Sequence, residues 1–212
     1  KVVIESPTEI MIHHGWTEMG QGVFTMAVQF LCEATGVNPN FISVKVDTSK
    51  DAPCGMTTAS RGTSLIGNSV LDAGNKLKAD LETHSLQELV GREYVGEWVC
   101  DWTTAIEADA DEPQTHYSYS YATQVVTLDD SGKVENVFAA HDAGRIVNPI
   151  LFEGQLEGSV HMGLGYALSE KFDMEEGRPV HTKLGKLGMI RAAATPNIVV
   201  IGIEEPDEFG PC

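Results

Sequence analysis

Positive charge is scarce in this chain of 212 residues. Its 14 lysines and arginines stand against 31 aspartates and glutamates, so the formal net charge is -17 at pH 7. Nucleic acids and anionic membrane surfaces are bound through positively charged protein surfaces. No apolar run approaches the roughly 20 residues that a transmembrane helix needs. We therefore expect no nucleic acid and no membrane among the partners of this chain.

Cysteine is also rare, and its four copies form no CxxC pair and no metal-ligand spacing. The histidines form no HExxH motif, and the neighbours His13 and His14 would point to opposite faces of a strand. We expect no metal ion or iron–sulfur cluster held by the side chains of this segment. A secretory signal is not visible, so we expect reduced thiols and a cytoplasmic protein.

Several common catalytic signatures are missing as well. The sequence has no GxSxG elbow and no GxxxxGK[ST] loop. The pair Gly20 and Gly22 lacks the third glycine and the following acidic residue of a dinucleotide-binding fingerprint. Lys1 begins in the middle of a strand pattern, and the chain stops after a turn-like Gly-Pro-Cys. We expect it to be a piece of a larger polypeptide.

Hydrophobic periodicity predicts an α+β fold with mixed sheets and packed helices. Two αβ subdomains are expected, residues 1–105 and 106–212, with the acidic, turn-rich stretch 101–114 as the seam. In the first, we predict strands at 2–13 and 41–46 and helices at 22–34, 64–81 and 85–90. In the second, we predict strands at 117–128, 134–140 and 197–204, a hairpin turn at 129–132 and a helix at 150–170.

The helix predicted from Ile150 to Glu170 contains four glycines, at positions 154, 158, 163 and 165. Each glycine disfavours an isolated helix by about 1 kcal/mol. We therefore expect another backbone or a ligand to approach this helix closely. Asn148 and Pro149 before it are typical of a helix start.

Three segments are candidate ligand-binding loops. Residues 14–22 (His-Gly-Trp-Thr-Glu-Met-Gly-Gln-Gly) form a strand-to-helix turn, where backbone N–H groups favour an anionic oxygen; alone, a tight turn explains its glycines. Residues 55–63 (Gly-Met-Thr-Thr-Ala-Ser-Arg-Gly-Thr) offer hydroxyls and a guanidinium at a helix start, although such residues also cap helices without a ligand. In residues 154–158 (Gly-Gln-Leu-Glu-Gly), Gln155 could contact a ligand and Glu157 could orient a neighbour, or the glycines could form a packing face.

The combination of these motifs is more specific than any one of them. Residues 17–22, residues 57–63, the segment 142–149 (Asp-Ala-Gly-Arg-Ile-Val-Asn-Pro), residues 154–158 and Gly163-Leu-Gly165 follow one another along the chain. Their order and spacing resemble the molybdenum-binding subunit of the xanthine dehydrogenase and aldehyde oxidoreductase family. The resemblance covers the chain from Val2 to Pro211 and identifies the family rather than one substrate.

The resemblance implies a molybdenum atom held by the dithiolene of molybdopterin, with or without an added nucleotide, and by no protein side chain. Glycine-rich loops would wrap the pterin and its phosphate. Arg61 stands at a position that varies in the family. The residues implied to bind the cofactor are Met19, Gly20, Gln21 and Gly22 from the first loop, Ala59, Ser60 and Gly62 from the second, and Gln155 from the third.

The family reaction hydroxylates an electron-poor carbon with oxygen from water, and a glutamate near the metal acts as the base. Relatives carry this glutamate in a Gly-x-Gly-Glu segment shortly after the motif that ends in Gly-Pro. Here the chain ends at Cys212, before that residue, so no catalytic residue is assigned. Glu157, Glu204 and Glu205 do not occupy the matching position. We expect the isolated segment to be inactive.

The resemblance also implies partners: the N-terminal half of the molybdenum subunit, iron–sulfur (2Fe-2S) and FAD subunits or domains, and a small-molecule substrate. A purine or another N-heterocycle is the expected substrate of the parent protein. Aldehyde-, nicotinate- or carbon monoxide-oxidising relatives remain alternatives. So do a non-catalytic binding or assembly module with this fold and a binder of another phosphorylated ligand.

Overall fold

The computed structural model describes residues 1–47, 49, 52, 55–116 and 118–206. Backbone contacts divide the chain into two compact units, Lys1–Ser118 and a second that begins at Tyr119. The boundary after residue 105 that the sequence suggests remains a prediction. The two units are described separately below.

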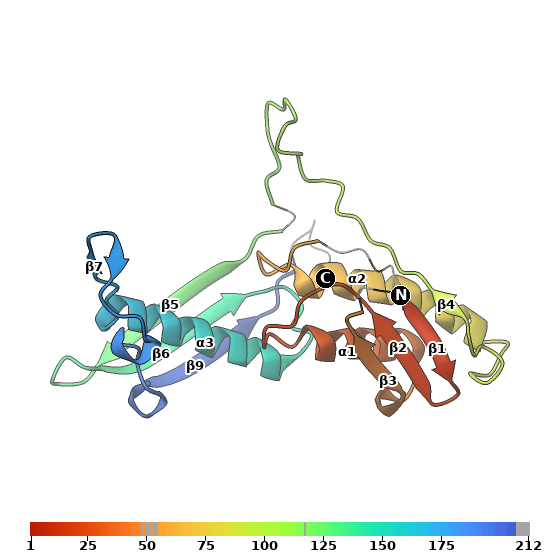
Figure 1. Cartoon of the computed structure of the whole chain (residues 1–212), viewed down its shortest axis with the longest axis horizontal. Coiled ribbons are helices and arrows are strands. Elements are labelled where there is room, and N and C mark those ends of the chain that lie inside the picture. Colours follow the sequence, from red (N-terminus) through yellow and green to blue (C-terminus); the bar gives the residue numbers. More distant parts are fainter. Residues whose placement is uncertain (48, 50–51, 53–54, 117, 207–212) are drawn as a thin grey trace. The chain divides into compact units, whose positions relative to one another are not determined.

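The first unit contains a four-stranded sheet with the order β3-β2-β1-β4 (Figure 1). β1 (Val2–Ser6) pairs antiparallel with β2 (Glu9–His13) and with β4 (Glu93–Tyr94), and β3 (Ile42–Lys45) runs parallel to β2. The prediction of one strand over 2–13 was wrong, because a turn at residues 7–8 folds it into a hairpin. Proline has no N–H for a ladder and favours such a turn.

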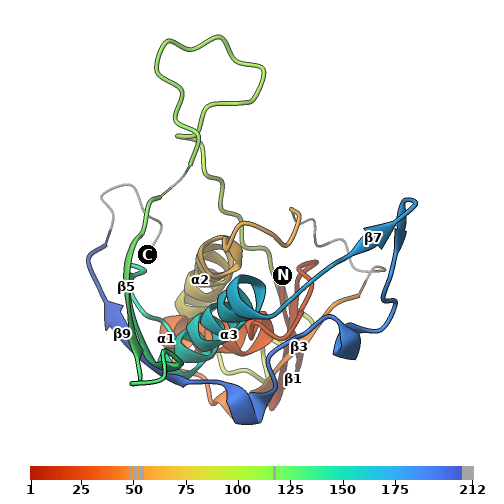
Figure 2. The same ribbon diagram turned by 90° about the vertical axis from the view of Figure 1, so that its left-hand side faces the viewer.

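Two helices pack against each other in this unit (Figure 2). α1 (Val23–Thr35) and α2 (Gly62–Leu81) confirm the predicted helices. Gly36 ends α1 at φ 71°, and its N–H donates to the carbonyl of Cys32 over 2.7 Å, the expected C-terminal cap. A Cβ on Gly74 would lie 2.7 Å from the Cβ of Ala34. Glycine therefore lets the two backbones approach closely.

The connections of the first unit are irregular. A short 3-10 turn, η1 (Pro39–Phe41), leads into β3. The helix predicted at 85–90 was wrong, since this stretch forms only turns, with Leu89 fully buried beneath them. Six residues are too few to offset helix nucleation without a longer apolar face. After β4 the described residues up to 118 form no helix or strand, as the yellow-green segment in Figure 1 shows.

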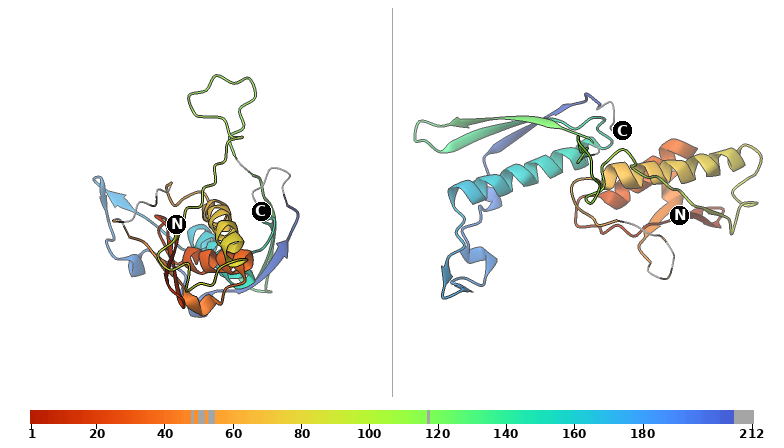
Figure 3. Two further views of the ribbon diagram at one scale, coloured as in Figure 1. Left: turned by 90° about the vertical axis from the view of Figure 1, so that its right-hand side faces the viewer. Right: turned by 90° about the horizontal axis from the view of Figure 1, so that it is seen from above.

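The second unit contains a three-stranded sheet with the order β5-β6-β9. β5 (Tyr121–Leu128) pairs antiparallel with β6 (Val134–Asp142), which pairs parallel with β9 (Asn197–Ile203). The predicted hairpin is confirmed: the carboxylate of Asp129 accepts the N–H groups of Ser131 and Lys133 at 2.9 and 3.0 Å. α3 (Pro149–Leu168) runs along the sheet (Figure 3), and its Val160 packs on Val137 and Ala139.

Smaller elements connect α3 to β9. They are the strand pair β7 (Met174–Glu175) and β8 (Arg178–Pro179) and the 3-10 turns η2 (Leu184–Lys186) and η3 (Ala192–Ala194). Sheets of mixed direction with packed helices confirm the predicted α+β class. Among the helices that the structure describes, none is both long and apolar enough to cross a membrane.

Within the second unit, most glycines of α3 lack the close backbone neighbour that the sequence predicts. A Cβ on Gly154, Gly158 or Gly163 would meet no described atom of this unit within 4 Å. A Cβ on Gly165 would instead meet the carboxylate of Glu170. Three of the four glycines therefore leave an open helix surface within their own unit.

Candidate functional site

The first glycine loop connects β2 to α1, and Glu18 organises it. One carboxylate oxygen of Glu18 accepts the N–H groups of Gly20 and Gly22 at 2.8 and 3.0 Å, and the other accepts the N–H of Phe24 at 3.2 Å. Gly22, the residue at the N-cap of α1, has no side chain to do this. The anionic oxygen that the sequence predicts at these N–H groups is therefore supplied by the carboxylate of Glu18.

Gln21 closes the same loop from its other side. Its side-chain oxygen accepts the N–H of Met19 at 2.6 Å, and its Nε2 donates to the carbonyl of Thr17 at 2.9 Å. Gly20 and Gly22 have φ of 98° and 85°, a region that other residues rarely enter. The amide of Gln21 therefore holds the loop, while the Met19 side chain is 67% exposed.

The second loop contains two consecutive left-handed residues that are not glycine. Ala59 has φ 55° and Ser60 has φ 52°. Left-handed backbone is costly for residues with a Cβ, and such strain concentrates at functional sites. Arg61 then turns back: its Nε and Nη2 donate to the carbonyl of Met56 at 3.2 and 2.7 Å, and its guanidinium lies 5.4 Å from the ring centre of Trp16.

The structure brings these first two loops together. The N–H of Thr17 donates to Oγ1 of Thr57 at 2.9 Å, and Trp16 of the first loop carries the guanidinium of Arg61 from the second. The two loops immediately precede α1 and α2, and these helices pack against each other. Met19, Gly20, Gln21 and Gly22 therefore lie on one of two joined loops, and Ala59, Ser60 and Gly62 lie on the other.

The N-termini of the two helices differ in their free donors. The first turn of α1 is capped by Glu18, as described above. α2 has no side-chain cap and no acidic residue in its first turn. Among the described residues, no acceptor lies on the N–H groups of Gly62, Thr63 and Ser64. The start of α2 is therefore the place in these loops where an added anion finds open donors.

The third candidate loop lies in the second unit. Gln155 and Glu157 are exposed on α3. The segment 142–149 before them is a structural turn: Oδ1 of Asp142 accepts the N–H of Gly144 at 3.2 Å, and Oδ1 of Asn148 accepts the N–H of Leu151 at 3.0 Å as the cap of α3. The predicted helix start at Asn148 and Pro149 is thereby confirmed.

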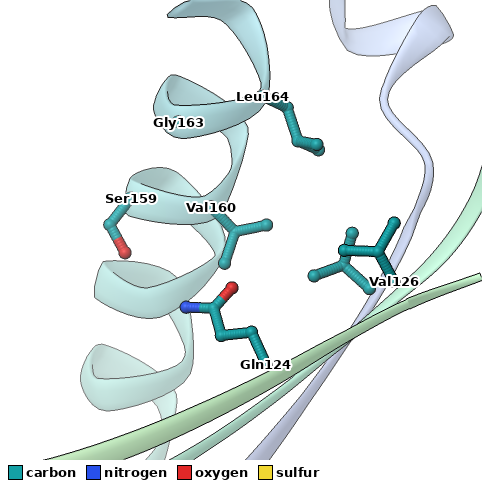
Figure 4. Close-up of a pocket in the computed structure, with 7 residues that line it drawn as sticks. Gln124, Val126, Ser159, Val160, Gly163 and Leu164 are labelled. Atoms are coloured by element: carbon teal, nitrogen blue, oxygen red, sulfur yellow. The ribbon is translucent and has the colours of Figure 1, made fainter. Parts of the chain in front are cut away.

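A shallow hollow of about 360 Å³ lies between α3 and the sheet of the second unit. Figure 4 shows the Gln124 side chain on β5 and the Val160 and Leu164 side chains on α3 around it. The sequence motifs did not include Gln124. None of the described residues that line the hollow has a titratable side chain, so its walls supply apolar contacts, the Gln124 amide and the Ser159 hydroxyl rather than acid–base chemistry.

Two histidines stand immediately before the first loop and are buried. His13 and His14 are 3% and 8% exposed. Nδ1 of His14 accepts the N–H of Trp16 at 3.1 Å, and its ring meets Phe24 edge-on at 5.2 Å. Burial lowers the pKa of His14 to about 4, so it is neutral at neutral pH. Within the described residues, no three His, Cys, Asp or Glu side chains gather as a metal-ion site.

Comparison with known proteins identifies the chain. The sequence-family model of the molybdopterin cofactor-binding domain matches residues 1–196 of this chain. The chain belongs to this family. Its first and second candidate loops, the segment 142–149 and Gln155 all fall inside the matched range.

Two curated relatives of this chain are xanthine dehydrogenases by name. A probable xanthine dehydrogenase subunit from Bacillus subtilis (strain 168) is 26% identical and aligns with 100% of this chain and 33% of its own length. The xanthine dehydrogenase/oxidase of Rattus norvegicus is also 26% identical, over 82% of this chain and 15% of its own length. The chain thus spans a third or less of these relatives.

The fold is shared with solved structures. The aldehyde oxidoreductase of Desulfovibrio gigas superposes with a TM-score of 0.79 at 23% identity, covering 99% of this chain and 25% of that protein. At this identity the likeness establishes the fold alone.

Sequence reasoning missed Glu18 and the buried histidines. A signal for Glu18 was present, because a helix whose N-cap is a glycine needs another acceptor for its first N–H groups. The only carboxylate in residues 14–22 is Glu18. The burial of His13 and His14 had no such signal, since polar residues next to a glycine loop are more often exposed.

Proposed function

We propose that this chain binds molybdopterin through the two joined loops and that its parent protein is a molybdenum-dependent hydroxylase resembling xanthine dehydrogenase. One observation supports this most strongly. The glycine loop of residues 14–22, which its own hydrogen bonds hold in place, contacts the loop of residues 55–63, and this second loop leads into the uncapped N–H groups at the start of α2. That pairing lies within the range matched by the molybdopterin-binding family.

The residues fit the cofactor. Its phosphate needs N–H and hydroxyl donors, and the start of α2 offers the free N–H groups of Gly62, Thr63 and Ser64 beside the exposed Ser60. Met19, Gly20, Gln21 and Gly22 would form a rigid wall, because Gln21 and Glu18 already satisfy the loop's own backbone. Ala59 completes the second loop, and Gln155 would contribute an amide from α3.

The bound molybdenum would supply the two-electron redox chemistry by which an electron-poor carbon is hydroxylated with oxygen from water. In this proposal the described residues of this chain orient the cofactor. Oε1 of Glu204 accepts the N–H of Ile146 at 2.7 Å and Glu157 is exposed on α3, and we assign the role of base to neither.

A purine or another N-heterocycle is our proposed substrate of the parent, supported by two relatives that are named xanthine dehydrogenases. One of them is named as a subunit, which supports partner chains. We propose that the N-terminal half of the molybdenum subunit completes the site. Iron–sulfur (2Fe-2S) and FAD subunits or domains would carry the electrons away, in a cytoplasmic complex.

The test replaces Gln21 with Ala in the full-length protein, produced in a host that makes the cofactor. Gln21→Ala removes the two hydrogen bonds that hold Met19 and Thr17, so we expect molybdenum per polypeptide to fall about tenfold. The matched control is Glu33→Gln, on the exposed side of α1, which should keep wild-type metal content.

Unchanged metal in Gln21→Ala would contradict the assignment of this loop to the cofactor. A wild-type protein without molybdenum or pterin would favour the non-catalytic module. If phosphate compounds bind that metal-free protein, a binder of another phosphorylated ligand becomes the better description.

A further inference from the structure

The carboxylate of Glu18 does two things at the first loop. It satisfies the N–H groups of Gly22 and Phe24 at the start of α1, and it accepts the N–H of Gly20 within the loop. Together with the two bonds of Gln21, five hydrogen bonds fix a segment of only a few residues. Such a loop has its binding conformation before any ligand arrives.

Glu18 is also a fixed negative charge. Partial burial raises the pKa of its carboxyl group, but the N–H groups of Gly22, Phe24 and Gly20 outweigh burial and bring the pKa below its ordinary value. A helix N-terminus attracts an anion through its free donors and its dipole. At the start of α1, the Glu18 carboxylate already occupies N–H donors and offsets the helix dipole. The start of α2 has no side-chain cap and no acidic residue in its first turn.

We propose that Glu18 is a positioning residue: it presets the Met19–Gly22 loop for the pterin and keeps the phosphate away from the start of α1, so that it binds at the start of α2. This inference rests on the proposed function, which it deepens by dividing the work between the two loops. It assigns to Glu18 a role through the loop and no contact with the reacting atoms.

The experiment compares Glu18→Gln with wild type in the full-length protein. Glutamine keeps the shape but offers one acceptor oxygen in place of two, and its NH₂ would face an N–H donor. The first readout is hydrogen exchange in the peptide covering residues 18–24, in protein made without cofactor. The second is molybdenum per polypeptide in protein made with cofactor.

Two control variants separate positioning from general damage. Glu33→Gln makes the same charge change on the exposed side of α1, and Ile4→Val trims a fully buried side chain on β1. Only Glu18→Gln should speed exchange in residues 18–24 and lower molybdenum content, each by about tenfold, the size of a lost helix cap. Both controls should match wild type in both readouts.

Each remaining outcome overturns one specific statement. Equal exchange in Glu18→Gln and wild type means that Glu18 does not preset the loop. Faster exchange with unchanged molybdenum means that the preset loop does not serve the cofactor. Absence of molybdenum from wild type overturns the proposed function itself, and the exchange comparison still decides whether Glu18 holds the loop. A drop in molybdenum in Ile4→Val equal to that in Glu18→Gln overturns the positioning role in favour of a merely structural one.

Discussion

At the scale of single residues, His14 makes the stability of the first unit depend on pH. Burial lowers its pKa to about 4, whereas an unfolded histidine has a pKa of 6.5. Between about pH 6.5 and pH 4 the unfolded chain therefore binds more protons than the folded one, so stability falls as the pH falls. The loss reaches about 3 kcal/mol at most. Urea unfolding at several pH values measures it.

The variant His14→Asn isolates this effect. Its Oδ1 can still accept the N–H of Trp16, the bond that Nδ1 of His14 makes, but asparagine does not titrate. We expect the pH dependence in this window to flatten. An unchanged slope in His14→Asn would show that another group carries the effect.

A second prediction concerns the left-handed Ala59. A φ of 55° raises the conformational energy of a residue that has a Cβ, whereas glycine adopts it without strain. Ala59→Gly should therefore raise the free energy of unfolding by about 1 kcal/mol. Ala79→Gly, on the exposed side of α2, should lower it by about 0.5–1 kcal/mol. Thermal or urea unfolding checks the opposite signs; a loss of stability in both variants would contradict strain at Ala59.

At the scale of elements, the contact between α1 and α2 depends on a small residue. A Cβ on Gly74 would lie 2.7 Å from the Cβ of Ala34, and neither group can rotate away. Gly74→Ala should therefore destabilise the protein by about 1–2 kcal/mol, although alanine is the better helix former. Gly158→Ala on α3 meets no described atom of its own unit. In the 212-residue chain we expect it to raise stability by up to about 1 kcal/mol.

Both outcomes can be read from urea midpoints at a shared slope. Gly74→Ala as stable as wild type would mean that the helices can separate at no cost. A loss of stability in Gly158→Ala would mean that α3 already has a close neighbour over its glycines, as the sequence led us to expect.

The helices were the most predictable elements. α1 and α2 follow from apolar periodicity, and Gly36 predicts the end of α1. The start of α3 follows from Asn148, its N-cap, and Pro149, its first residue. The strand over residues 2–13 was not divided in advance, because the alternation continues on both sides of the turn at Pro7. The sequence of residues 85–90 resembles a short helix although the stretch forms turns. A single buried residue, Leu89, leaves the same spacing of apolar residues in these turns as in one turn of a helix.

At the scale of the whole molecule, the family was predictable because it depends on the order of motifs, which a sequence preserves. The matched range of residues 1–196 confirms it. How the two loops are joined was not predictable. The hydrogen bond from Thr17 to Thr57 joins residues that are 40 apart in the chain, and it depends on how β2, α1 and α2 are placed, which residue spacing does not specify.

Molybdenum and pterin per polypeptide in the full-length protein, from a host that makes the cofactor, test the central claim most directly. The account predicts close to one molybdenum atom and one pterin for each chain, and both should fall together by about tenfold in Gln21→Ala. Purified full-length protein that contains neither molybdenum nor pterin would contradict it.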